Sequence, residues 1–357
     1  MKIVAVIMAG GKGERFWPKS RTNMPKQFLS LTNDGKTMIQ HAVERISSLV
    51  DIEDVFVVTN KRYKDLVFNQ LQGIPEENIL LEPIAKNTAP CIGLAAVHIK
   101  KKYEDAIMLV LPSDHLIKYN ELFIDTLKDA IKVATEGNNL ATIGITPSYP
   151  ETGYGYINFG SKKEGNYLAY EVTKFVEKPN IDKAKEYLAS GKYLWNSGMF
   201  VWKVSTILKN FEVLLPATYD SLMSICDSIG QKDEQTILEQ EFNQMSSESI
   251  DYGIMEHASN IYTFPGNFGW DDVGSWLAIE RINTTNENGN IVNGNVITID
   301  SKDSIIQGQD KLIATVGIDN LIIVDTEDAM LICSKDNTQD VKKVLENLKI
   351  CNRREYL

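Results

Sequence analysis

A glycine-rich loop with two nearby cations follows the first apolar run of the chain. Residues 2–8 lead directly into residues 10–18, which hold three glycines and Arg15, and Lys26 lies in the Pro-Lys-Gln-Phe segment that follows. Closely spaced glycines let backbone N–H groups approach phosphate oxygens. The glycines alone would indicate only a tight turn, but arginine and lysine side chains bind phosphate through charge-assisted hydrogen bonds. We therefore interpret this region as the site of a phosphate-bearing ligand.

The spacing of the glycines disfavours two familiar nucleotide-binding loops. A GxGxxG dinucleotide loop would need a glycine where this chain has Phe16. The best Walker candidate, residues 30–37, has Ser30 in place of the first glycine and follows no strong strand. The loop pattern therefore argues against a Rossmann dehydrogenase and against a P-loop enzyme.

Two acidic positions could hold a metal ion near such a ligand. Asp114 follows the apolar run 106–111, and Asp272 lies between two tryptophans in residues 269–276. Proteins bind Mg²⁺ through one or two carboxylates together with substrate phosphates. The spacing leaves open whether the two carboxylates meet, and Asp114 could instead cap a turn.

Two further polar segments lie in the middle of the chain. Glu177 and Lys178 end a strand-like run, in which neighbouring side chains point to opposite faces until the strand ends. Asn196 lies in a Trp-Asn-Ser-Gly sequence typical of a bend. Taken alone, the first is an ordinary exposed pair of charges and the second an ordinary bend.

The composition limits the classes of protein to which the chain can belong. Of its 357 residues, 37 are basic and 48 acidic, and the net charge of −11 argues against non-specific nucleic-acid binding. No apolar run reaches the roughly 18 residues of a membrane span, and no signal cleavage site follows the first run. The four scattered histidines do not predict a zinc site. The cysteines form no CxxC pair, which favours reduced thiols in a cytoplasmic protein. They are Cys91, Cys226, Cys333 and Cys351.

Strands and helices alternate through the first half of the chain. Apolar runs predict buried parallel strands at residues 2–8, 54–59, 78–81, 106–111 and 140–146. Amphipathic stretches predict helices at residues 37–50, 61–71, 88–102 and 121–135. This order indicates an α/β fold with a Rossmann-like mixed, mostly parallel sheet flanked by helices. Such a sheet binds its ligand beyond the carboxyl ends of its strands.

The last quarter of the chain has a different pattern. Residues 283–290 are polar and asparagine-rich, and we interpret them as a linker. Strand-like runs follow at residues 295–299, 304–307, 312–316, 321–324 and 329–333. A final helix comes next, with Asn337 as its expected cap. The glycines keep no six-residue period, so a long β-helix is not expected. We predict a large domain at residues 1–285 and a small β-rich, short β-helix-like domain at residues 286–357.

Together these segments resemble the mannose-1-phosphate guanylyltransferases, or GDP-mannose pyrophosphorylases, of the sugar-phosphate nucleotidyltransferase superfamily. The match follows the family's order at residues 10–18, 25–28, 82–83, 87–90, 112–115, 151–157, 177–179, 195–200 and 270–274. The resemblance implies the nucleotide-diphospho-sugar transferase fold, residues 1–285 as the catalytic domain, and a homodimer. Many members carry a further isomerase domain, for which 357 residues leave no room.

The resemblance also implies a role for each matching residue. The nucleotide would be bound by Gly10, Gly11, Gly13, Arg15, Lys26, Asn87 and Thr88, the last two at the purine base. The metal would be bound by Asp114 and Asp272, because relatives vary at the position of Asp271. The sugar phosphate would be bound by Gly153, Glu177, Asn196 and Asp251, with Lys178 at its phosphate. The catalytic residues would be Arg15, Lys26, Asp114 and Asp272.

The implied reaction is attack by mannose 1-phosphate on the α-phosphorus of GTP, which gives GDP-mannose and pyrophosphate with Mg²⁺ as cofactor. A phosphate monoester has a second pKa of about 6, so it is already ionised at neutral pH and needs no general base. Catalysis then consists of positioning two anions and neutralising their charge. Two alternatives stay open: transfer with another sugar 1-phosphate or nucleotide, and a non-catalytic regulatory subunit that binds nucleotide sugars.

Overall fold

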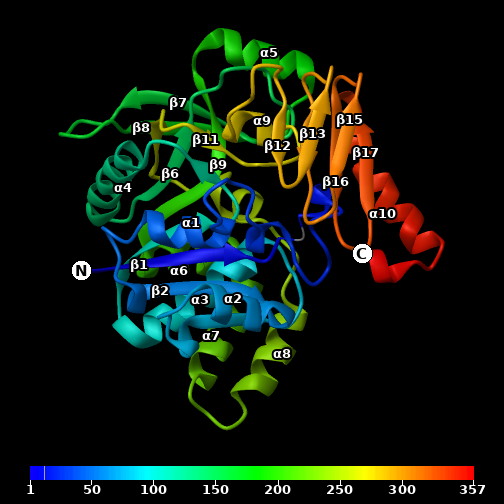
Figure 1. The fold of residues 1–357 in the computed structure, drawn as a ribbon. Coiled ribbons are helices and arrows are strands. Elements are labelled where there is room, and N and C mark those ends of the chain that lie inside the picture. The colour runs from blue at the N-terminus through cyan, green and yellow to red at the C-terminus, as the bar shows by residue number, and fades with distance from the viewer. Residues whose placement is uncertain (12) are drawn as a thin grey trace. The chain divides into compact units, whose positions relative to one another are not determined.

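The computed structural model describes residues 1–11 and 13–357, which form two compact units (Figure 1). The first unit comprises residues 1–10, 42–113 and 117–270, and the second comprises residues 11–41, 114–116 and 271–357. Lys12, in the glycine-rich loop, lies outside the described residues. Within the described ranges, no helix is both long and apolar enough to cross a membrane. The domain boundary expected at residue 285 stays a prediction.

A nine-stranded mixed sheet is the framework of the first unit. Its strands are β1 (Lys2–Ala9), β2 (Val55–Asn60), β3 (Ile79–Glu82), β4 (Ala106–Pro112), β6 (Leu140–Ile145), β7 (Tyr156–Lys162), β8 (Tyr170–Val176), β9 (Tyr193–Lys203) and β10 (Ile261–Gly266). They lie in the order β3-β2-β1-β4-β9-β6-β10-β8-β7. Only β8 and β9 among these strands run opposite to the rest, because each pairs antiparallel with its neighbours. The predicted mixed, mostly parallel sheet is confirmed.

Helices pack on both faces of this sheet. The helices on the sheet are α2 (Lys64–Gln70), α3 (Thr88–Tyr103), α4 (Asn120–Thr135), α5 (Ile181–Ser190) and α6 (Val204–Leu214). Helix α7 (Pro216–Ser228) packs on α3 and α6, and α8 (Glu234–Gln244) packs on α7. Helices α3, α6 and α7 share a core with Val4 and Val6 of β1. The alternate residues Ala5 and Ile7 are equally buried, as expected of a strand covered on both faces. Helix α4 packs against β6, β9 and β10, and Figure 1 shows it across the sheet from α3.

The parallel strands bring several polar residues to one edge of the sheet. Because β1 pairs in parallel with β2 and β4, and β2 with β3, the carboxyl ends of these four strands meet. Gly10 follows β1, Glu82 ends β3, and Ser113 follows β4. The Ser113 amide donates to the carbonyl of Met8 at 3.1 Å, which ties the β4 end to the β1 end.

Short strands and the glycine-rich loop form the second unit. The strands are β12 (Ile291–Asn293), β13 (Val296–Ile299), β14 (Ile305–Gln307), β15 (Ile313–Val316), β16 (Leu321–Asp325) and β17 (Met330–Ser334), and α9 (Ala278–Ile282) and α10 (Val341–Ile350) flank them in sequence. Strands β12, β14 and β16 form one parallel ladder and β13 and β15 another, which agrees with a short β-helix-like fold. Phe16 and Trp17 of the loop share the core of Ile305, Ile322 and Leu345. Three elements, α1 (Met38–Arg45), β5 (Leu116–Ile117) and β11 (Trp270–Asp271), cross from one unit to the other along the chain.

Two expectations for the last quarter of the chain are corrected by the structure. Asn337 does not cap the final helix, because it lies inside a 3-10 turn, Lys335–Asp340, in which the Ser334 hydroxyl accepts from the Asp336 amide. The asparagine-rich segment is more than an exposed linker. Asn290 is 1% exposed and bonds the carbonyl of Ser301 and the amide of Ser304, so it is part of the β-rich fold.

Candidate functional site

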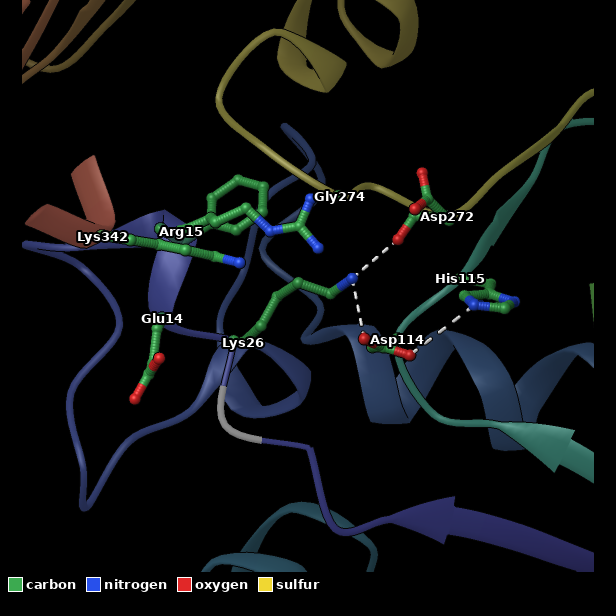
Figure 2. A pocket seen from close by; sticks show the side chains of 10 residues that line it. Glu14, Arg15, Lys26, Asp114, His115, Asp272, Gly274 and Lys342 are labelled. Atoms are coloured by element: carbon green, nitrogen blue, oxygen red, sulfur yellow. Dashed lines mark hydrogen bonds and ion pairs between the residues drawn. The ribbon is translucent and has the colours of Figure 1, made fainter. Parts of the chain in front are cut away.

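A charged pocket of about 290 Å³ lies within the second unit (Figure 2). Its walls come from the glycine-rich loop, the Lys26 segment, the turn at Asp114, the Asp272 turn and the start of α10. The lining residues are Gly13, Glu14, Arg15, Phe16, Lys26, Asp114, His115, Asp272, Gly274 and Lys342. Five of the residues that the sequence singled out for phosphate or metal thus border one pocket.

Lys26 joins three of these segments. Its side chain is buried, and its Nζ lies 2.8 Å from Oδ2 of Asp114 (Figure 2). The same ammonium donates to the carbonyls of Asp272 at 2.7 Å and Val273 at 3.0 Å. A lysine ammonium has three protons to donate. Lys26 therefore has its hydrogen-bonding capacity satisfied by the protein, and it fixes Asp114 beside the Asp272 turn.

Gly13 is required by the close approach of the loop to Lys26. Its φ is +59°, in the region that favours glycine, and a Cβ there would clash with Cβ of Lys26 and lie 2.7 Å from its backbone nitrogen. Backbone atoms cannot yield to such a contact as a flexible side chain can. The structure thus gives this glycine a packing reason in addition to the expected approach of the loop amides to phosphate.

Asp114 is held in its ionised form. Burial would raise its pKa, but the positive charge of Lys26, the neighbouring His115 and the hydrogen bond from Lys26 outweigh burial and lower the pKa below its usual value. Asp114 is therefore a carboxylate at neutral pH.

The second carboxylate, Asp272, depends on a glycine and on its acidic neighbour. A Cβ at Gly274 would lie 2.7 Å from Oδ2 of Asp272. Asp271 instead accepts from the Val273 amide at 2.8 Å and pairs with Arg281. Val273 has a φ of +47°, a strained conformation for a β-branched residue, and the hydrogen bond from its amide to Asp271 restrains it there. Asp271 thus shapes the turn, while Asp272 lines the pocket.

The pocket offers carboxylate ligands to a divalent cation, but the protein alone does not complete the coordination of the ion. Among the described residues, no group of three or more histidines, cysteines, aspartates or glutamates is arranged to hold a metal. Asp114 and Asp272 border the same pocket. Two carboxylates completed by phosphate oxygens are the donor set that Mg²⁺ prefers, so the residues present fit that ion.

The other loop residues expected at the nucleotide take different positions. Arg15 lines the pocket, and within the described part of the chain its guanidinium has no hydrogen bond or ion pair. Gly10 follows β1 in the first unit and is close to a buried carboxyl, because a Cβ there would lie 3.2 Å from Oε2 of Glu82. Gly11 does not line the pocket, and its carbonyl accepts from the Gln27 side chain at 3.0 Å.

A second polar cluster lies in the first unit and contains most residues expected at the sugar. Asn196 donates from Nδ2 to Oδ1 of Asp251 at 2.7 Å. A Cβ at Gly155 would lie 2.7 Å from Oε2 of Glu177 and 3.5 Å from Cβ of Asn196, so these side chains converge over that glycine. Burial raises the pKa of Asp251 to about 6, the bond from Asn196 opposes this, and the charge of Glu177 adds to it. The cluster is rich in acceptor oxygens that suit sugar hydroxyl groups.

Two other residues expected at the sugar phosphate lie beside this cluster in the chain. Lys178 has a φ of +32° and pairs with Glu177. The Gly153 amide donates to the Glu151 carboxylate at 2.7 Å, so that N–H is already satisfied. Asn196 and Asp251 therefore bring acceptor oxygens to the cluster, whereas the Gly153 amide already donates to Glu151.

The residues expected at the base form the start of α3. Asn87 has a φ of +70° and accepts from the Thr88 amide at 2.9 Å, which caps the helix. The Thr88 hydroxyl accepts from the amide of Ile250 at 2.9 Å. Residues 87–88 are thereby fixed to the segment that precedes Asp251.

Three residues at or near these sites had no assigned role from the sequence. Gly155 and Glu82 lay in the matching segments 151–157 and 82–83, and that membership is a usable signal. Burial raises the pKa of Glu82 to about 7. Lys342 had no such signal, because a lysine on a final amphipathic helix is ordinarily a solvent-exposed residue.

Comparisons with known proteins cover the whole chain. The nucleotidyl transferase family model matches residues 4–289, and a model described as a MannoseP isomerase/GMP-like beta-helix domain matches residues 294–348. The mannose-1-phosphate guanylyltransferase of Salmonella montevideo is 40% identical over 99% of this chain and 76% of its own length. The protein of the same name from Escherichia coli strain K12 is 39% identical over 99% of this chain and 75% of its own length.

A solved structure agrees with these matches. The protein of Thermus thermophilus described as mannose-1-phosphate geranyltransferase has a TM-score of 0.88 and 33% identity, with 98% of this chain and 100% of that chain covered. The mixed α/β fold and the β-rich C-terminal part are both supported by this similarity and by the two family models.

Proposed function

The chain belongs to the nucleotidyl transferase family and is a transferase, and we propose that it transfers GMP from GTP to α-D-mannose 1-phosphate, giving GDP-mannose and pyrophosphate. The observation that carries this proposal is the convergence of the glycine-rich loop, Asp114 and Asp272 on Lys26 in one pocket. Relatives that match nearly the whole chain and are named for this activity support the choice of substrates.

The nucleotide is assigned to the loop, the pocket and the start of α3. Arg15 and the backbone of the loop glycines would bind phosphate oxygens, and Lys26 would keep the loop against the metal carboxylates while its charge faces the same anion. Asn87 and Thr88, rigidly held by their own hydrogen bonds, would border the purine base.

The sugar phosphate is assigned to the acceptor cluster of the first unit. Asn196, Asp251 and Glu177 would accept or donate hydrogen bonds with the sugar hydroxyls, and Lys178 would bind the phosphate once it leaves Glu177. The backbone at Gly153 would border the sugar without a free N–H of its own.

Mg²⁺ would be held by Asp114 and Asp272 together with phosphate oxygens, and it would neutralise charge on the transferring group. The sugar phosphate oxygen forms the new bond to the α-phosphorus, and the bond from that phosphorus to pyrophosphate breaks with its electron pair on the leaving oxygen. The protein's contribution is to position the two anions and to offset their repulsion with Arg15, Lys26 and Lys178.

A substrate matrix tests this proposal. GTP, ATP, UTP and dTTP would each be combined with mannose 1-phosphate or glucose 1-phosphate in the presence of Mg²⁺, and released pyrophosphate would be measured. We expect the highest kcat/KM for GTP with mannose 1-phosphate and no release after EDTA. A higher value for another pair would replace the assigned substrates, and tight binding of GDP-mannose without turnover would favour a regulatory subunit.

The assembly and location are proposed with the activity. We propose a homodimer, which the family resemblance supports. We also propose a cytoplasmic location, which is supported by the four cysteines, all of them free thiols and two of them buried. Light scattering coupled to gel filtration measures the assembly directly, and a mass of one chain at working concentration would contradict the dimer.

A further inference from the structure

The C-terminal helix α10 is packed against the glycine-rich loop. Within the second unit it contacts the 3-10 turn Glu14–Phe16, and Lys349 pairs with Glu14 at 3.7 Å. After the helix, the carbonyl of Tyr356 accepts from Nε1 of Trp17 at 2.7 Å and from Arg21 at 2.9 Å. The C-terminal segment therefore forms part of the frame around the proposed phosphate site.

Lys342 differs from neighbouring lysines in having no partner among the described residues. On the same helix Lys343 pairs with Asp340 at 2.9 Å, and before it Lys335 pairs with Glu280. Lys342 lines the pocket with Arg15, and in the described part of the chain its ammonium has no ion pair or hydrogen bond. Figure 2 shows its side chain reaching from α10 toward the space that Arg15 and Lys26 also face.

Three acids line the same pocket, and two of them are paired with other lysines. Glu14 is engaged by Lys349, and Asp114 is engaged by Lys26. Arg15 and Lys342 therefore bring to one pocket two positive charges that no described residue pairs, and like charges in a shared site repel. An anion with several oxygens would relieve that repulsion and accept hydrogen bonds from both side chains.

We propose that Lys342 binds the β- and γ-phosphates of the nucleotide, together with Arg15, and holds the pyrophosphate that leaves. This assignment rests on the proposed function. As the bond from the α-phosphorus breaks, the electron pair stays on the oxygen that joined the α- and β-phosphorus, which becomes a terminal oxygen of pyrophosphate, and Lys342 stabilises that charge. The C-terminal part then contributes a binding residue to the active site as well as a packing surface.

The test compares Lys342→Met with Lys343→Met, its neighbour on the same helix whose partner lies outside the pocket. Binding of inorganic pyrophosphate with Mg²⁺ is measured by calorimetry, and KM values are measured for GTP, for pyrophosphate in the reverse reaction and for the sugar phosphate. We expect Lys342→Met to weaken pyrophosphate binding and raise the KM for GTP and pyrophosphate by about 10- to 100-fold, as for loss of a charged hydrogen bond. The KM for the sugar phosphate and the melting temperature should stay unchanged.

Two further variants and outcomes make the test decisive. Lys342→Arg should restore most of the pyrophosphate affinity, because it returns a cation, whereas Lys342→Gln should not. Wild-type affinity in Lys342→Met, or equal weakening in Lys343→Met, would overturn the inference. Absence of turnover by the wild type with any substrate pair would contradict the proposed function, while selective loss of pyrophosphate binding in Lys342→Met would still support the role of Lys342.

Discussion

The charged pocket of the second unit and the acceptor cluster of the first unit shift the pKa of a carboxyl group in opposite directions. In the pocket, Lys26 lowers the pKa of Asp114 and keeps it ionised, while Arg15 and Lys342 have no partner in the described chain. In the cluster, burial raises the pKa of Asp251 to about 6, and Asn196 is its hydrogen-bond partner. The pocket thus contains two cations without a partner in the described chain, and the cluster contains acceptor oxygens.

The difference follows from the ligands that each region would bind. Phosphate oxygens are charged acceptors, so their site needs cationic donors that the protein leaves available. Sugar hydroxyls are neutral and can donate, so their site needs carboxylate and amide oxygens. The contrast teaches that cations with and without protein partners have separate roles. Lys26, whose three hydrogen bonds are all made to the protein, organises the pocket. Arg15 and Lys342 offer hydrogen bonds to a ligand.

Removing the organising cation should break the pocket most severely. We expect Lys26→Met to lower kcat by on the order of 10² to 10³, because it removes a positive charge near the reacting phosphates. It also leaves Asp114 without its ion pair, so the melting temperature should fall while the protein stays folded at 25 °C. Steady-state kinetics and circular dichroism measure both effects. A Lys26→Met enzyme with wild-type kcat would contradict the assigned role.

Displacing Lys26 without removing its charge gives the next largest effect. Gly13→Ala places a Cβ against the Lys26 backbone, so kcat should fall by on the order of 10² although every cation is still present. Gly35→Ala is the matched control, since Gly35 has a φ of +77° in the same unit but open space around a Cβ. Equal activity losses in the two variants would show that backbone strain, and not the contact with Lys26, is responsible.

Neutralising the acceptor cluster should affect the other substrate. Asp251→Asn keeps the shape but replaces a carboxylate oxygen, and we expect the KM for mannose 1-phosphate to rise about tenfold with the KM for GTP unchanged. Exposed Glu256, just after the π-helix Asp251–Met255, provides the control Glu256→Gln. A rise in the KM for GTP alone would show that Asp251 serves the nucleotide instead.

The same variant has a signature in stability. The folded-state pKa of Asp251 lies above its ordinary value of 3.8, so the folded protein holds this proton more tightly and loses stability as the pH rises from about 4 to about 6. Asp251→Asn should lack that contribution, which thermal melts across this pH window would measure. An unchanged pH dependence would show that Asp251 ionises normally.

The smallest effect is expected at Glu82, at the carboxyl edge of the sheet. Its pKa of about 7 lies above the ordinary value of 4.5, so stability falls as the pH rises through that interval and stays lower above it. Glu82→Gln should therefore raise the melting temperature by about a few degrees at pH 8 and leave it unchanged at pH 4. Glu77→Gln, at an exposed position before β3, should have no effect at either pH. A lower melting temperature for Glu82→Gln at pH 8 would contradict the prediction.

Local patterns were sufficient to predict much of the fold. The apolar runs at β1 and β4 were predictable because strands buried on both faces leave a continuous apolar signature. Asn337 was wrongly expected to be a cap, because the Ser334 hydroxyl begins a 3-10 turn earlier and a single-residue rule cannot rank the two candidates.

Long-range packing limited what could be predicted of the candidate site. Arg15 and Lys26 were predictable as a pair because they lie close in sequence to the glycines. The contact of Gly13 with Lys26, and the entry of Lys342 into the same pocket, depend on folding of segments that are distant in the chain. No periodicity or motif on α10 separates Lys342 from Lys343; only the pocket does.

The Tyr356 carbonyl, bonded by Trp17 and Arg21, has a practical consequence for handling the protein. An affinity tag or fluorescent label attached after Leu357 would start next to the bonds that brace the glycine-rich loop. It could lower the apparent nucleotide affinity without touching any ligand-binding side chain. Met1 is exposed at the start of β1, at the end of that strand opposite the loop, and is the better point of attachment.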